Sequence, residues 1–157
     1  ACLLFALTTL ATLTACGEEE AAATISVKVF PARLAEKPLE RRGWLAAGGD
    51  YGGGARSGAS TYLIAEKPLL TEWNLSAIKV ATLTDGNAAV TGRLNAYAKR
   101  EVSEFTANAE TQRGYLAVQI DGRWADVPLL TRITDRITIY GFTAEEAQRL
   151  ERHLATR

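Results

Sequence analysis

The alternation of hydrophobic and polar residues predicts β-strands in several separate parts of the chain. Residues 24–30 carry apolar side chains at every second position, at Ile25, Val27 and Val29. A period of two is typical of a strand that buries one face. Further strands are expected at 61–70 and within the sequence RITIYG near the C-terminus.

Asp85-Gly86-Asn87 is a turn sequence between two apolar stretches. Turns of this composition join neighbouring antiparallel strands. We therefore expect Ile78 and Val80 to share one face of the first strand, and Val90 and Leu94 one face of the second.

Asp121-Gly122 predicts a tighter hairpin, because both central positions of a type I′ turn need positive φ. Its strands would pair Ile120 with Arg123. Strict alternation then puts one pair of residues on the core face, Ala125 and Val127, and another pair on the outer face, Trp124 and Asp126.

Two stretches have the period of an amphipathic helix. Val102, Phe105 and Ala109 lie at positions i, i+3 and i+7, which form one stripe, and Gly114 lies just past it. The second helix is marked by a capping box, with Thr143 as N-cap and Glu146 at N3. Its expected buried stripe consists of Ala147, Leu150 and Leu154. Phe142, just before the helix, could pack onto Ala147 as a hydrophobic staple.

This order of elements predicts an α+β fold, an antiparallel β-sheet with two helices packed on one face. The segment 43–60 has seven glycines in 18 residues and is expected to be a surface loop. It lacks the Lys of a phosphate-binding Gly-x4-Gly-Lys-Ser/Thr motif. A phosphate site is therefore not expected there.

The first residues resemble an export signal. Residues 2–15 carry no charge and are too few to span a bilayer, which takes about 20 apolar residues. Leu13-Thr14-Ala15-Cys16 resembles the bacterial lipobox, in which the Cys thiol forms a thioether to diacylglycerol. The alternatives are an ordinary signal peptide with an incidental Cys, or a buried helix.

The lipobox hypothesis divides the chain into three parts. Residues 1–15 are expected to be a signal peptide truncated at its start, and 16–23 a lipidated Cys16 with a flexible tether. Residues 24–157 are expected to form a single domain. Acyl chains in pairs anchor a protein stably, so we expect a membrane-anchored lipoprotein of the bacterial envelope, facing the periplasm or the cell exterior.

Composition argues against several classes of function. The chain carries 18 basic and 18 acidic residues, so the basic excess of a nucleic-acid-binding protein is missing. No cysteine follows Cys16, and His153 is the only histidine. We interpret His153 as a surface cation near a helix C-terminus, and we expect no metal and no cofactor.

The carboxylate pairs do not suggest an active site. Glu18–Glu20 lies in the expected tether, Glu145–Glu146 in the helix cap, and Asp121 and Asp126 in the hairpin. A glycosidase-like pair needs two acids across a cleft. We therefore expect a protein that is not an enzyme.

Several phrases, in order, resemble one family. They are ISVKVFPARL, YLIAEKPLLTEWNLSAIKVA, FTANAETQRGYLAVQIDGRWADVP and ITIYGFTAEEAQRL. Together they resemble the head subdomain of the first periplasmic domain of SecD, a protein-export subunit, here as a stand-alone lipoprotein form. SecD also has transmembrane helices, which are not found after Cys16. The resemblance implies the head fold and contact with polypeptide outside the membrane.

The leading hypothesis is a non-enzymatic interaction module. Its partners would be the membrane, through the lipid anchor, and unfolded polypeptide or a protein of an envelope or translocation complex. The proposed interaction surface contains Trp124, Asp126 and Tyr140, since aromatic side chains at outer positions suit peptide recognition. The alternative is a small-molecule or envelope-stress sensor that uses the Gly-rich segment as a lid.

Overall fold

The computed structural model describes residues 24–34, 44–49, 60–109, 114–131 and 133–157. Its strands are β1 (Val27–Leu34), β2 (Trp44–Gly49), β3 (Ser60–Ala65), β4 (Leu70–Thr71), β5 (Leu75–Thr82), β6 (Asn87–Leu94), β7 (Tyr115–Ile120), β8 (Arg123–Asp126) and β9 (Arg136–Thr143). The helical elements are the 3₁₀ turn η1 (Glu72–Asn74) and the α-helices α2 (Ala96–Ala109) and α3 (Ala144–Ala155).

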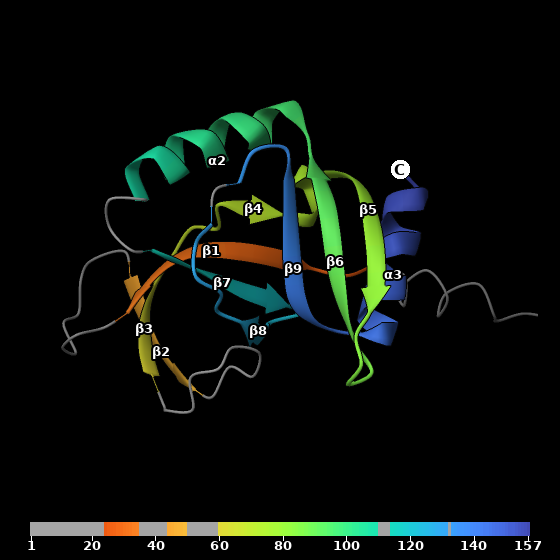
Figure 1. Cartoon of the computed structure of the whole chain (residues 1–157), viewed down its shortest axis with the longest axis horizontal. Coiled ribbons are helices and arrows are strands. Elements are labelled where there is room, and N and C mark those ends of the chain that lie inside the picture. The colour runs from red at the N-terminus through yellow and green to blue at the C-terminus, as the bar shows by residue number, and fades with distance from the viewer. Residues whose placement is uncertain (1–23, 35–43, 50–59, 110–113, 132) are drawn as a thin grey trace, which may run out of the picture.

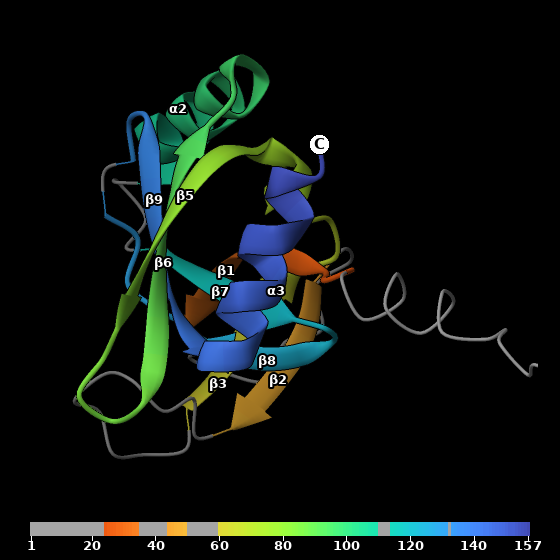
Figure 2. The ribbon, with the colours of Figure 1, turned by 90° about the vertical axis from the view of Figure 1, so that its right-hand side faces the viewer.

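The α+β prediction is confirmed, and the strands are divided between two antiparallel sheets (Figure 1). The large sheet has the order β2-β3-β1-β7-β8, with β4 also paired to β1. The small sheet has the order β5-β6-β9. Figure 2 shows the small sheet on one side, α2 at its end, and α3 between it and the large sheet.

Strand β1 continues past the expected end at Phe30. On one side it pairs with β7, from Val27 opposite Ile120 to Ala32 opposite Tyr115. On its other side β4 covers the start of β1 and β3 covers its end. Pro31 lies between those two paired segments, where its missing N–H leaves no ladder bond unmade.

The prediction of a loop at 43–60 is wrong for residues 44–49. These form β2, which pairs with β3 from Trp44 opposite Ala65 to Gly49 opposite Ser60. Pairing with a distant strand overrides the low strand propensity of glycine, because β propensity depends on context. Residues 43 and 50–59, which include most of the proposed lid, lie outside the described residues.

The hairpin of the small sheet is confirmed. Val80 lies opposite Val90, and Gly86 in the turn has φ of 83°. Val90 and Leu94 are buried, as predicted, while Ile78 and Val80 are half-buried and pack against the core from the sheet's edge.

The β7–β8 hairpin has the predicted turn but not the predicted alternation. Ile120 pairs with Arg123, and Asp121 and Gly122 both have positive φ, at 46° and 83°. Gln119 pairs with Trp124 and Val118 with Asp126, so β8 has one extra residue, Ala125, between the two pairs. Such a bulge changes the direction of the following side chains. Two predicted positions are therefore wrong: Asp126 is buried, and Val127 packs against a hydrophobic cluster on the outer face of the large sheet that includes Phe30 and Tyr62.

Both predicted helices are confirmed. In α3, the Thr143 hydroxyl accepts a bond from the Glu146 N–H at 3.1 Å, and the Glu146 carboxylate accepts one from the Thr143 N–H at 2.8 Å. Helix α2 begins at Ala96 after Asn95, whose side chain accepts a bond from the Ala98 N–H at 2.9 Å. This cap was not foreseen from the sequence.

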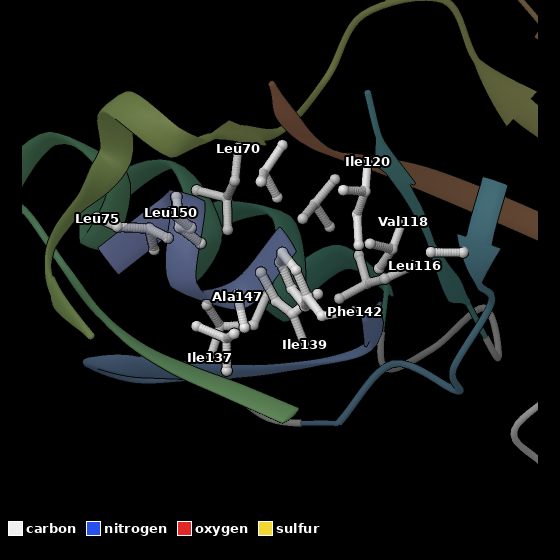
Figure 3. Packing of buried hydrophobic residues seen from close by; sticks show 14 of the residues in the cluster. Leu70, Leu75, Leu116, Val118, Ile120, Ile137, Ile139, Phe142, Ala147 and Leu150 are labelled. Atoms are coloured by element: carbon white, nitrogen blue, oxygen red, sulfur yellow. The ribbon is translucent and has the colours of Figure 1, made fainter. Parts of the chain in front are cut away.

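The main hydrophobic core lies between the two sheets and is closed by the two helices (Figure 3). Phe142 precedes α3 and is fully buried, as is Ala147 one turn into the helix. Both belong to the same cluster, as the predicted staple requires. The stripe of α3 is confirmed at Ala147 and Leu150, and Leu154 packs against the cluster from its margin.

The first described residues are bound to three separate elements. Ser26 N–H donates to the Asp121 carboxylate and Val27 N–H to the Glu72 carboxylate, each at 2.9 Å. The Arg149 side chain donates to the Thr24 carbonyl and forms an ion pair with Asp121 at 2.9 Å. We call this set the N-terminal clamp, because it fixes the start of β1 to η1, the β7–β8 turn and α3.

Among the described residues, no helix combines the length and the apolar character that crossing a membrane requires.

Candidate interaction surface

The three residues proposed from the sequence do not form one exposed surface. Trp124 is half-buried on the large sheet, with its ring edge-to-face against Phe30 at a centroid distance of 5.4 Å. Asp126 is only 8% exposed. Tyr140 lies on β9 of the small sheet and is 44% exposed. Only Tyr140 is therefore well placed to meet a partner directly.

Trp124 belongs to an aromatic cluster on the outer face of the large sheet. Phe30, Tyr62 and Ile64 are buried in this cluster, and Tyr115 packs edge-to-face against Tyr62 at 5.3 Å. Ring pairs in this arrangement stabilise a packed surface beyond the area they bury. This face is therefore packed hydrophobic structure, in which Trp124 has a structural role.

Asp126 directly follows Ala125, the extra residue of the β8 bulge. Its carboxylate accepts a bond from the Val127 N–H at 2.8 Å, which favours the charged form. Burial opposes that charge more strongly and raises the pKa of Asp126 above its ordinary value.

We expect Asp126→Asn to raise the free energy of unfolding above that of the unsubstituted protein, and to do so more at pH 7 than at pH 3. The unfolded chain releases the Asp126 proton near the ordinary pKa, while the native state keeps it to higher pH. The contribution of this group to stability is therefore full below the ordinary pKa and falls as the pH rises through the raised pKa. Urea unfolding of both proteins at the two pH values measures this difference, and a variant that gains no stability at pH 7 would contradict it.

The outer face of the small sheet has no described helix or strand over it (Figures 1 and 2). Thr91 lies opposite Lys79 on one side and Thr138 on the other, and the two threonine hydroxyls lie 3.0 Å apart. Residues directly opposite each other share a face. We define the open face by this row and the rows on either side: Ala77, Lys79, Ala81, Ala89, Thr91, Arg93, Arg136, Thr138 and Tyr140.

The open face is cationic. Its nine positions include Lys79, Arg93 and Arg136, which are all exposed, and no acidic residue. Asp135 precedes β9 and lies 3.8 Å from Arg136, a long and exposed ion pair. In the part of the chain that the structure describes, neither Lys79 nor Arg93 takes part in an ion pair. In a chain of zero net charge, the face concentrates one sign.

Strand β5 is an edge of the small sheet. Among the described strands it pairs with β6 alone, so its outer backbone N–H and C=O groups have no ladder partner there. The opposite edge, β9, is held close to β8 of the large sheet: the Arg123 side chain donates to the Gly141 carbonyl at 3.1 Å and pairs with Glu146 at 2.8 Å. The edge available for pairing is therefore β5.

Gly141 allows β8 and β9 to approach. It has φ of 86°, and a Cβ at this position would lie 2.8 Å from the Ala125 carbonyl oxygen. The register of β9 against β6 shifts at the same place, where Tyr140 and Gly141 together face Ala89. This irregularity turns Phe142 into the core while Tyr140 stays on the open face.

His153 is half-buried in the structure instead of lying on the surface as expected. Its ring is edge-to-face with Trp73 at 5.7 Å, and its Nε2 atom is buried without a hydrogen-bond partner among the described residues. The Arg157 guanidinium lies over the ring of Trp73, with its Cζ atom 3.5 Å from the ring centroid. Trp73 thus contacts both His153 and Arg157, and it follows Glu72 of the N-terminal clamp.

No group of three or more His, Cys, Asp or Glu residues in the described part of the chain is arranged to hold a metal ion. Cys2 and the proposed lipidation site Cys16 lie outside the described residues.

Comparison with known proteins gave matches in solved structures alone. No family model and no curated protein matches the chain. It is similar in part to SecDF, described as a membrane component that enhances protein export, with 22% identity and a TM-score of 0.46 over 58% of this chain. A second structure, of SecDF in the super-membrane-facing form, matches with 22% identity and a TM-score of 0.45 over 58% of this chain. The chain spans 41% of the first protein and 12% of the second.

Proposed function

We propose that this protein is a lipid-anchored, non-enzymatic domain of the bacterial envelope that binds polypeptide on the open face and along the edge of β5. The observation that carries the proposal is that the open face and the free edge of β5 adjoin each other, since the open face includes alternate residues of β5 itself. A chain lying there could use both surfaces at once.

Strand addition explains why this edge suits polypeptide. An extended peptide that pairs with an edge strand gains main-chain hydrogen bonds, and its alternate side chains meet the face of the sheet. Strand β5 is eight residues long, comparable to the other strands of the small sheet. A bound peptide would extend this sheet to a fourth strand and cover an apolar edge formed by Ile78 and Val80.

Site-specific photocrosslinking tests the proposal. A photoreactive phenylalanine at Tyr140, on the open face, is expected to capture polypeptide in living cells. Tyr97 on α2 is the matched control, because it is an aromatic residue that is 59% exposed and lies off the open face. Equal capture at both positions, or capture of lipid alone at Tyr140, would overturn the proposal.

The lipid anchor has its own test. Cys16→Ser removes the thiol that would carry diacylglycerol, so it is expected to abolish metabolic labelling by fatty acid. Cys2→Ser is the matched control, because it removes the other cysteine from the expected signal peptide and should leave labelling unchanged. Labelling that persists in Cys16→Ser would exclude this residue as the anchor.

A further inference from the structure

We propose that the open face selects acidic, extended polypeptide, with carboxylates at every second residue. This inference rests on the proposed function and names the class of segment that the site would take. It begins from the placement of three cations, Lys79, Arg93 and Arg136, on a surface that no described element covers.

Arg93 and Arg136 lie directly opposite each other on neighbouring strands. Like charges in this position repel and destabilise a sheet. Asp135 offsets only part of this repulsion, because it lies at 3.8 Å from Arg136 and both side chains are more than half exposed. A carboxylate bound between the two guanidinium groups would remove the repulsion and give each arginine a partner.

Lys79 extends the cationic row toward the free edge. It lies two residues beyond Ala77, which is opposite Arg93, so it is one step further along the strands. Residues i and i+2 of an extended chain are about 7 Å apart. Acidic side chains at alternate positions of a bound strand would therefore match the step between the arginine row and Lys79.

The remaining positions keep the surface low. Ala77, Ala81 and the buried Ala89 are small, and the Thr91 and Thr138 hydroxyls share a hydrogen bond with each other. The carboxylates of a peptide paired with β5 can therefore extend across these short side chains toward the longer cationic ones. Tyr140 at the end of the face adds apolar contact area with a polar tip.

Polypeptide fits this site better than an anionic lipid surface. Headgroups could meet the three cations, but the outer backbone groups of β5 would gain nothing from them. Only another polypeptide supplies N–H and C=O groups at the spacing of a strand ladder. The cationic face and the free edge meet at Lys79 on β5, so alternate carboxylates of a segment paired with β5 would lie on the side of the sheet that carries Lys79, Arg93 and Arg136.

Binding of labelled peptides to the full chain tests this inference. Three fluorescent peptides would alternate Thr with Glu, Gln or Lys, and anisotropy would report affinity. The Glu peptide is expected to bind about tenfold more tightly than the Gln peptide, because three exposed ion pairs each contribute modestly. The difference should shrink at high salt.

Two matched triple variants locate the effect. Lys79→Gln with Arg93→Gln and Arg136→Gln is expected to reduce binding of the Glu peptide to the level of the Gln peptide. Lys28→Gln with Lys67→Gln and Arg152→Gln changes the net charge equally at exposed sites off the open face, and should leave the preference intact. Equal losses in both variants would overturn the assignment to this face.

The outcomes separate this inference from the proposed function. If all three peptides bind equally while Tyr140 still crosslinks polypeptide in cells, the acidic preference is wrong and polypeptide binding stands. If no peptide binds and Tyr140 captures no polypeptide, both are wrong. Tight binding to vesicles of phosphatidylglycerol and phosphatidylethanolamine, lost in the open-face variant, with no peptide preference, would replace polypeptide by lipid.

Discussion

Phe142→Ala is expected to lower the free energy of unfolding by about 3–5 kcal/mol. Phe142 has no exposed surface and lies where β9 passes into α3, in the cluster that joins both sheets (Figure 3). Its removal would leave a cavity that the surrounding side chains cannot fill, since the cluster draws on several elements that are held by their own pairing. A single residue thus links the small sheet, α3 and β7.

Urea unfolding followed by far-UV circular dichroism measures this loss, and Phe142→Leu should cost less because it retains more of the buried volume. Leu129→Ala is the control for loss of apolar surface, because Leu129 is 57% exposed and is expected to change stability by about 0.5 kcal/mol or less. Similar losses in Phe142→Ala and Leu129→Ala would contradict the packing described here.

Gly141→Ala is expected to lower the free energy of unfolding by about 2–5 kcal/mol, through two separate effects. A residue with a Cβ pays about 1–2 kcal/mol for the left-handed conformation at φ of 86°. The Cβ would also lie 2.8 Å from the Ala125 carbonyl oxygen, and forcing the strands apart adds about 1–3 kcal/mol. Neither the backbone of β8 nor that of β9 can move without disturbing the contact between the sheets.

Gly122→Ala separates these effects. Gly122 has φ of 83°, nearly the same as Gly141, but a Cβ there would meet nothing within 4 Å. Its substitution should therefore cost only the conformational part. If the two alanine variants lose the same stability, the close approach of β8 to β9 is not what requires glycine at position 141.

Local features were predictable from the sequence, and long-range ones were not. The turns at Gly86 and Gly122 and the cap at Thr143 depend on residues within a few positions of each other. The division into two sheets depends on which distant strands pair, and periodicity carries no information on that choice. The bulge at Ala125 was also missed, and in the structure it lies where β8 approaches Gly141 of β9.

Of the residues on the open face, only Tyr140 was proposed from the sequence as a contact residue. Of the residues that the sequence offered for contact, Trp124 packs on the large sheet and Asp126 is buried. The relevant pattern was in the positions between the buried ones. Lys79 alternates with Ile78 and Val80, and Arg93 precedes the buried Leu94, so the polar face of the hairpin was present in the sequence. Its concentration of positive charge became evident only when β9 added Arg136.

The N-terminal clamp has a mechanical consequence. If the domain is held by its N-terminus and a partner pulls on the small sheet, tension enters at Thr24 and runs lengthwise along β1. Because β1 is an interior strand, its ladder bonds to β7 on one side and β3 and β4 on the other would be loaded together in shear. Bonds loaded together resist rupture better than bonds peeled one at a time, so β1 would resist such a load as a unit.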